Sequence, residues 1–125
     1  MSRIRRAAAV ATAAAITLSA CGTNPEEDAL TQAVSEYVVA YTSGDVLSAY
    51  AMLSDRCKEQ ISVETFEVLV KGAADQYGTR EVLEITVDSI RSDRGKVTYD
   101  VGVTALSKSE QNWLRVGDTW RWDAC

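Results

Sequence analysis

The chain contains no histidine, and this absence limits the chemistry that it can support. Of its 125 residues, 3 are cysteine, 1 is proline and 1 is phenylalanine. Without histidine, no cysteine can be activated by an imidazole, so a Cys-His nucleophile pair is excluded. Zinc sites draw mainly on cysteine and histidine, so a zinc centre is poorly supplied. We therefore expect no metal site and no cofactor.

The sequence has only one long apolar run, and it lies at the N-terminus. Three arginines among the first six residues precede an alanine-rich stretch, residues 7–20, which is typical of an export signal. That stretch is too short to span a bilayer, which takes roughly 20 residues. It ends in Leu18-Ser19-Ala20-Cys21, which resembles the lipobox of bacterial lipoprotein signal peptides at all four positions. The alternative is an ordinary secretory signal followed by an unpaired cysteine.

The lipobox resemblance implies where the protein acts. Residues 1–20 would be a signal peptide that is removed, and Cys21 would carry a diacylglycerol as the new N-terminus. We expect a protein anchored by lipid to the extracytoplasmic side of the cell membrane. Loss of the three arginines moves the formal net charge from −5 to about −8, which argues against nucleic acid and against electrostatic docking on anionic lipid. Attachment would come from the lipid itself.

The tether between the lipid and the folded domain is short. Asn24-Pro25-Glu26-Glu27 combines a capping residue, proline at the first helical position and glutamate at the third, so a helix begins there. Residues 21–23 would be the lipidated cysteine and the tether, with a reach of roughly 10 Å, and residues 24–125 a single domain. In the alternative, a frayed first turn of the helix lengthens the tether.

Two further cysteines, Cys57 and Cys125, remain for the folded domain. In an oxidising compartment they are most simply one disulfide. The bond would close a loop of about 69 residues and contribute roughly 4 kcal/mol by chain-entropy arguments. It would also hold the C-terminus, which otherwise frays. A catalytic thiol or a metal ligand is the competing interpretation, and the lack of histidine counts against both.

Three helices are predicted ahead of the strands. The first is capped by Asn24 and ended by Gly44, the second runs from Asp45 to Cys57, and the third from Ser62 to Gly78. Apolar residues recur in each at helical spacing, so each helix has one buried stripe. The inward positions are Leu30, Val34, Tyr37 and Tyr41, then Val46, Tyr50, Leu53 and Cys57, then Phe66, Leu69, Val70, Ala73 and Tyr77.

From Arg80 onward the apolar period changes to two, which indicates strands. Two strands, residues 83–87 and 97–105, would be joined by a three-residue loop at residues 93–95. This register matches apolar residues with one another, and a slip of one residue would destroy the match. The predicted pairs are Leu83 with Ala105, Ile85 with Val103, and Val87 with Val101.

A second hairpin is predicted at the C-terminus, with a two-residue turn at Gly117-Asp118. Its pairs are Trp113 with Trp122 and Arg115 with Trp120, so one face gathers all three tryptophans and one arginine. The fold class is therefore α+β, with three N-terminal helices packed on a curved antiparallel sheet of about four strands.

Three segments together resemble the nuclear transport factor 2-like superfamily: residues 41–50 (YTSGDVLSAY), the element Leu53-Ser54…Cys57, and residues 116–122 (VGDTWRW). They look most like its small actinobacterial lipoproteins of uncharacterised role, over roughly the whole mature chain. The resemblance implies a cone-shaped, cystatin-like α+β fold, in which a curved sheet wraps a long helix and leaves a pocket at the open end. Members include isomerases, dehydratases, cyclases and non-enzymatic binding domains, so fold alone does not decide function.

Tyrosines and the tryptophan face would line this pocket. The candidate residues are Tyr37, Tyr41, Tyr50, Tyr99, Trp113, Arg115, Trp120 and Trp122. Tyrosines at helical spacing are more often core residues whose hydroxyls reach water or backbone. The tryptophans can equally close the end of the core while Arg115 reaches solvent. We expect no carboxylate inside the pocket and can name no catalytic base.

One carboxylate pair is predicted on the outer face of the sheet. In the register above, Asp88 and Asp100 lie directly opposite each other. Such a pair could share a proton or hold calcium. The competing interpretation is a solvated pair whose repulsion is softened by Arg91 and Lys96.

We therefore expect a membrane-anchored binding or accessory protein rather than an enzyme. The first hypothesis is an interaction module for an envelope protein, which requires an exposed contact patch. The second is a carrier or sensor of a small apolar ligand, which requires an open, mostly apolar cavity bordered by tyrosines and Arg115. The third, an isomerase or dehydratase, requires an aspartate or glutamate inside that cavity.

Overall fold

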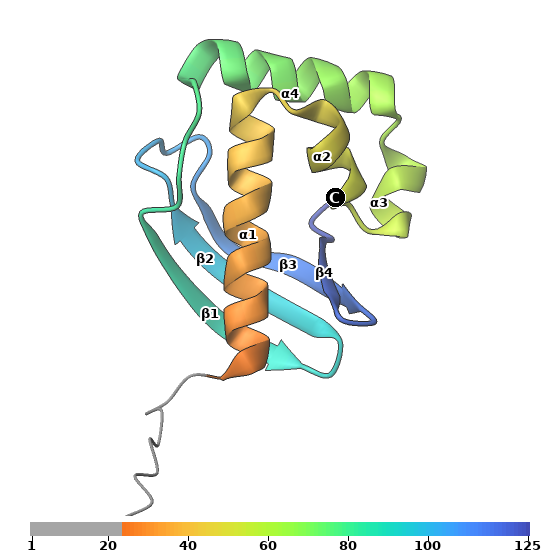
Figure 1. Ribbon diagram of the computed structural model, residues 1–125, viewed down its shortest axis with the longest axis vertical. Helices are drawn as coiled ribbons and strands as arrows, with labels where there is room; N and C mark the ends of the chain where they lie inside the picture. The colour runs from red at the N-terminus through yellow and green to blue at the C-terminus, as the bar shows by residue number, and fades with distance from the viewer. Residues whose placement is uncertain (1–23) are drawn as a thin grey trace, which may run out of the picture.

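The computed structural model describes residues 24–125 and shows an α+β fold in which helices pack against one open antiparallel sheet (Figure 1). The predicted signal peptide, Cys21 and the tether lie outside the described residues. Within residues 24–125, no helix is both long and apolar enough to cross a bilayer. The elements in chain order are α1 (Pro25–Ser43), α2 (Val46–Ala51), α3 (Asp55–Gln60), α4 (Val63–Tyr77), β1 (Glu84–Arg91), β2 (Arg94–Asp100), β3 (Lys108–Val116) and β4 (Thr119–Trp122).

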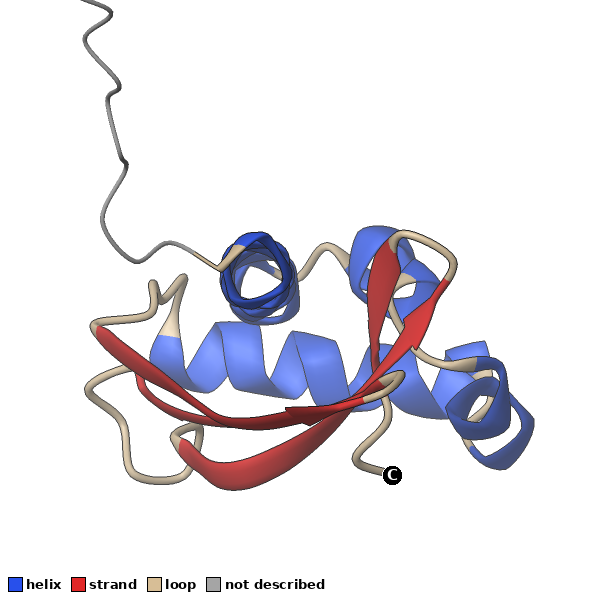
Figure 2. Ribbon diagram, turned by 90° about the horizontal axis from the view of Figure 1, so that it is seen from below, coloured by secondary structure: helices blue, strands red, loops and turns tan. Residues whose placement is uncertain are grey.

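Helix α1 begins and ends where the sequence predicts. The Asn24 side chain accepts a hydrogen bond from the Glu26 backbone N–H, and Pro25 occupies the first turn. Gly44 ends the helix in the left-handed conformation, at φ 81°. Figure 2 shows α1 lying across the concave side of the curved sheet, so its apolar stripe, which includes Leu30 and Val34, is fully buried.

The predicted second helix, residues 45–57, is instead two short helices, so residues 24–125 form four helices where three were predicted. Between α2 and α3 the backbone pairs with β4: the Trp122 N–H donates to the Met52 carbonyl, and the Ser54 N–H donates to the Trp122 carbonyl, both at 2.9 Å. The free edge of β4 thus forms hydrogen bonds with backbone groups that would pair within the helix if α2 and α3 were one continuous helix. The Ser54 side chain then caps α3 by accepting from the Cys57 N–H.

The first hairpin has a different register, and its inward face is as predicted at Ile85, Val87, Val97 and Tyr99 but not at Leu83 and Ala105, which are exposed. Ile85 lies opposite Tyr99 and Val87 opposite Val97, where Val103 and Val101 were predicted. The turn contains two residues, Ser92 and Asp93, rather than three. Strand β2 stops at Asp100 rather than residue 105, because residues 101–107 leave the sheet as a loop. The register is displaced by three residues beside the turn, and a bulge between Val87 and Ser89 makes this four over residues 84–87. There the displacement is even, so the side chains keep their faces while their partners change.

The second hairpin has the predicted register, with Trp113 opposite Trp122 and Arg115 opposite Trp120. Gly117 lies in the turn at φ 61°. Trp113 and Trp120 are buried against α1, and the Tyr37 ring stacks on Trp122 with centroids 5.9 Å apart. Aromatic side chains therefore hold α1 against this end of the sheet.

The C-terminus is fastened to α3. The sulfur atoms of Cys57 and Cys125 lie 2.07 Å apart, as the predicted disulfide requires. Beside them, the carboxylate of Asp123 accepts hydrogen bonds from Ser54 Oγ at 2.6 Å and from Arg56 Nε at 3.1 Å. This cluster joins β4 to the start of α3.

Candidate functional site

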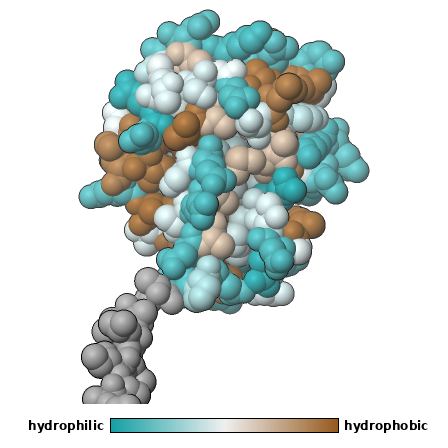
Figure 3. All heavy atoms as spheres, in the orientation of Figure 1, coloured by the Kyte–Doolittle hydropathy of each residue, from teal (hydrophilic) through white to brown (hydrophobic). Residues whose placement is uncertain are grey.

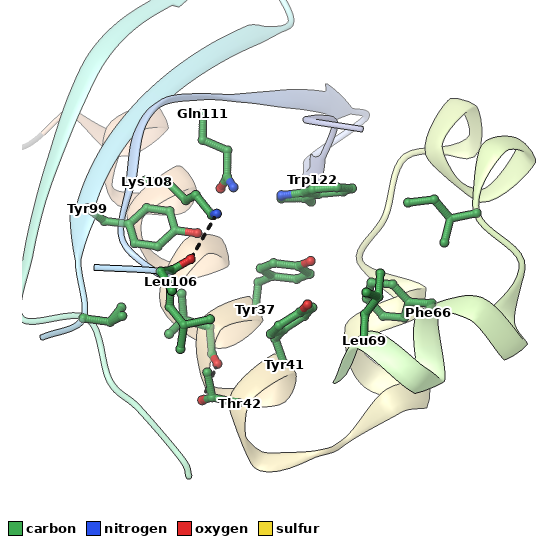
Figure 4. Close-up of a pocket in the computed structure, with 14 residues that line it drawn as sticks. Tyr37, Tyr41, Thr42, Phe66, Leu69, Tyr99, Leu106, Lys108, Gln111 and Trp122 are labelled. Carbon is green, nitrogen blue, oxygen red and sulfur yellow. Dashed lines mark hydrogen bonds between the residues drawn. The ribbon is translucent and has the colours of Figure 1, made fainter. Parts of the chain in front are cut away.

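A cavity of about 260 Å³ lies between α1, α4 and the concave face of the sheet (Figure 4). Its walls come from α1, α4, β2, β3, β4 and the loop 101–107. Tyr37, Phe66 and Tyr99 form buried parts of the wall, whereas Lys108 and Leu69 are exposed, the latter by 49%. The cavity therefore has an apolar interior and a mouth that reaches solvent.

Four of the eight predicted pocket residues line this cavity: Tyr37, Tyr41, Tyr99 and Trp122. Three of these are tyrosines, and burial is the main cause that raises their pKa values. The pKa of Tyr37 lies well above 10.0, helped by the neighbouring Tyr41 and Tyr99. Burial raises the pKa of Tyr99 to about 12, although the Gln111 amide beside it has the opposite effect. All three hydroxyls therefore stay protonated at neutral pH and cannot act as bases.

The other four predicted residues, Tyr50, Trp113, Arg115 and Trp120, lie outside the cavity. The Tyr50 hydroxyl donates to the Ile61 carbonyl at 2.9 Å. Trp113 and Trp120 are core residues, exposed by 2% or less. Arg115 forms an ion pair with Glu26, and its guanidinium lies 5.8 Å from the Trp120 ring centroid. The two tryptophans and Arg115 join α1 to the sheet, whereas Tyr50 joins α2 to the segment before α4.

Two polar residues of the cavity wall, Lys108 and Gln111, were missed by the sequence analysis. In a regular strand, residues three apart point to opposite faces of the sheet. From the sequence, Lys108 and Gln111 are therefore expected on opposite faces. The structure inserts an extra residue in β3 opposite β2, since Val97 pairs with Gln111 but Tyr99 with Lys108. No glycine marks this bulge, because its residue with positive φ is Glu110, at 48°.

The cavity wall contains hydrogen-bond donors and no carboxylate. The indole N–H of Trp122 is buried and has no hydrogen-bond partner within residues 24–125. Gln111 accepts from Trp113 Nε1 at 3.1 Å through Oε1, which leaves its amide N–H groups as donors. Lys108 Nζ contacts only the Ala105 carbonyl closely, at 3.5 Å. Figure 4 shows these three nitrogen-bearing groups on the same side of the cavity.

A buried carboxylate does exist, but it lies elsewhere. Asp123 is 6% exposed and belongs to the C-terminal cluster with Ser54 and Arg56. Asp123 could not be predicted as buried, because its partners lie almost 70 residues away in the chain. Its bonds are structural: they fix the end of the chain against α3.

The predicted pair of Asp88 and Asp100 does not form. Asp100 lies opposite Glu84 in the sheet, and Asp88 accepts a hydrogen bond from Thr98 Oγ1 at 2.7 Å. The physical reason is that the two-residue turn and a bulge between Val87 and Ser89 together shift the register. Among the described residues, 24–125, no three histidine, cysteine, aspartate or glutamate side chains gather in a way that could hold a metal ion.

Neither the models of known protein families, nor curated proteins, nor solved structures give a match for this chain. The geometry of the cavity is therefore the basis for a function.

Proposed function

We propose that this protein is a lipid-anchored binding protein, a carrier or sensor that holds a small, mostly apolar ligand at the extracytoplasmic face of the cell membrane. One observation carries the proposal: an apolar cavity, bordered by three tyrosines, opens to solvent in an otherwise packed core. Protein interiors leave few voids larger than a water molecule. A volume of about 260 Å³ lies just below the roughly 300–1,000 Å³ of pockets for drug-sized ligands, so the ligand is small.

The catalytic alternative has less support. An isomerase or dehydratase of the resembled superfamily would need an acid or base in contact with the ligand. The residues that line the cavity include no aspartate and no glutamate, and burial keeps the tyrosines protonated. Holding a ligand, rather than moving its protons, is what these side chains suit.

The interaction-module alternative would need one exposed contact patch. The large exposed apolar residues come from five different parts of the chain: Val39, Leu47, Val68 and Leu69, Leu83, and Val116. On the face shown in Figure 3, apolar side chains lie in separate groups with polar side chains between them. The cavity is the more definite feature, and it favours a small ligand.

The lipid anchor fits a carrier or sensor. Because α1 starts at Pro25, at most a few residues separate a lipid on Cys21 from the folded domain, a distance of roughly 10 Å. The domain would stay close to the membrane, where apolar molecules concentrate. Membership of the nuclear transport factor 2-like superfamily remains part of this proposal, supported by the order of elements and the α+β arrangement.

A direct test titrates the full lipoprotein in lipid nanodiscs with toluene, naphthalene and octan-1-ol. All three tryptophans lie within residues 113–122, so ¹⁵N-tryptophan labelling gives one indole signal from the cavity and two from outside it. We expect the Trp122 signal to move with at least one probe while those of Trp113 and Trp120 move less. Empty nanodiscs correct for partition of the probe into lipid.

A blocking variant shows whether the probe occupies the cavity. Ala105 lines the mouth, and its neighbour Thr104 does not, although both are exposed in the same loop. Ala105→Phe should weaken binding at least about tenfold, whereas Thr104→Phe should leave it unchanged. If no probe moves the Trp122 signal in the wild type, or if Ala105→Phe binds as well as the wild type, the proposed function is wrong.

A further inference from the structure

The bulge in β3 brings two side chains into the cavity that a regular strand would separate. Lys108 and Gln111 both line the cavity, although their spacing of three residues would place them on opposite faces of an unbroken strand. Bulges occur next to functional sites because they redirect a side chain. This one costs backbone strain, since Glu110 holds φ at 48°.

The result is a group of three hydrogen-bond donors on one side of the cavity. Within residues 24–125 the buried Trp122 N–H has no partner, and a buried donor without a partner is destabilising. The Gln111 oxygen accepts from Trp113, so its amide N–H groups face the same region, beside Tyr99. The Lys108 ammonium forms no ion pair within the described part of the chain. Together they offer one positive charge and several N–H groups to whatever enters.

We infer that the ligand of this cavity is a small apolar molecule with a carboxylate group, and that its carboxylate binds Lys108, the Gln111 amide and the Trp122 indole N–H. The inference rests on the proposed function and adds the chemistry of the ligand. The apolar part of the ligand lies against Tyr41 and Phe66, which Figure 4 shows away from Lys108 and Gln111. A carboxylate has acceptor oxygens only, so it complements these three donor groups.

Other ligand chemistries fit less well. A pure hydrocarbon would leave the Trp122 N–H without a partner and Lys108 without a counter-ion. An amine would meet the positive charge of Lys108, with no lining carboxylate to balance it. An alcohol oxygen can accept hydrogen bonds but carries no charge. A short fatty acid or a small aromatic acid satisfies both the charge and the donors.

The test compares octanoate with octan-1-ol, which share the same eight-carbon chain and differ in the head group. Titrations of the full lipoprotein in nanodiscs follow the Trp122 indole signal and the heat of binding at neutral pH. Charge-assisted hydrogen bonds are roughly twice as strong as neutral ones, so octanoate should bind about tenfold tighter. Lys108→Met should reduce this preference to less than about threefold, because it weakens octanoate more than octan-1-ol. Lys96→Met is the matched control, because Lys96 is exposed on β2 and lies outside the cavity.

The outcomes separate this inference from the proposed function. Tighter octanoate binding that depends on Lys108 but not on Lys96 supports both. Equal binding of octan-1-ol and octanoate overturns the acid preference but keeps a binding cavity. Octanoate binding that Lys108→Met leaves unchanged overturns the assigned position of the carboxylate. A Trp122→Phe variant should weaken octanoate more than octan-1-ol, and the reverse would also contradict the inference. Failure of every probe to bind overturns both.

Discussion

Glu110 shows at the scale of one residue how the cavity is shaped. It is held at φ 48°, in the left-handed region where a side chain crowds the backbone, at a cost of roughly 1–2 kcal/mol for an L-residue. Its backbone N–H is held by Thr98 Oγ1 at 3.1 Å, which fixes the bulge on β2. The strain is local, and its effect is to point Lys108 and Gln111 in the same direction.

Replacing Glu110 by glycine should therefore stabilise the protein. Glycine adopts positive φ without the steric penalty, and its greater freedom in the unfolded chain offsets part of that gain. We expect Glu110→Gly to raise the free energy of unfolding by about 0.5–1 kcal/mol in urea titrations. Ser109→Gly is the control, because Ser109 has an ordinary negative φ and should lose about 0.5–1 kcal/mol. A loss of stability in Glu110→Gly equal to that control would contradict the account.

At the scale of elements, the loop 101–107 forms part of the cavity wall and is held by one carboxylate. Asp100 Oδ1 accepts from the Gly102 N–H at 2.8 Å and from Ser107 Oγ at 2.9 Å. These bonds, that of Gly102 first, lower the pKa of Asp100 from its ordinary 3.8. The stabilisation of the loop by the charged form is thus present above pH 3.8 and is lost as the pH falls through the lowered pKa.

The Gly102 amide should report this titration. Its proton chemical shift should change with a midpoint below 3.8, the ordinary pKa of aspartate, when spectra are recorded over the acidic range. Asp100→Asn should remove that step, since the side chain no longer ionises, and Asp88→Asn should leave it in place. A midpoint at or above the ordinary value would show that the two hydrogen bonds do not favour the carboxylate.

The bounds and pairing of an element can be predicted from the sequence where neighbouring residues alone determine them. The caps at Asn24 and Ser62, the glycine ends and the Gly117 turn were predicted and are confirmed, because each needs only its neighbours. The break at Met52–Ser54 was not predicted, because β4 lies about 70 residues away and supplies its partners. The hairpin register failed for a different reason: two alignments match apolar residues, and the two-residue turn together with a bulge between Val87 and Ser89 decides between them.

The candidate site divides in the same way. Helical spacing predicts the tyrosines of α1 as pocket residues, and the hairpin register predicts Trp122. The presence of Lys108 and Gln111 in the cavity wall depends on a bulge, and no glycine or proline in the sequence predicts that bulge. Arg115 was predicted to line the pocket because its neighbours in the hairpin are tryptophans. Its partner in the structure is Glu26, which lies near the other end of the chain.

For the molecule as a whole, the link between Cys57 and Cys125 holds the two halves of the fold together. It joins α3 to the C-terminus across 68 positions of sequence. We predict that a Cys57→Ser/Cys125→Ser double variant loses about 4 kcal/mol of unfolding free energy in urea. A reducing agent should cost the wild type a similar amount and leave the double variant unchanged. If reduction does not alter the wild type, the two thiols are not bonded in the protein.

The most direct measurement of the central claim is native mass spectrometry of the lipoprotein extracted from the envelope of its own cells. The account predicts a chain that begins at an acylated Cys21 and carries a non-covalently bound small acid. That molecule should also be present on Thr104→Phe and absent from Ala105→Phe. A chain that begins at Met1, or a wild-type protein that is bare in every preparation, would contradict it.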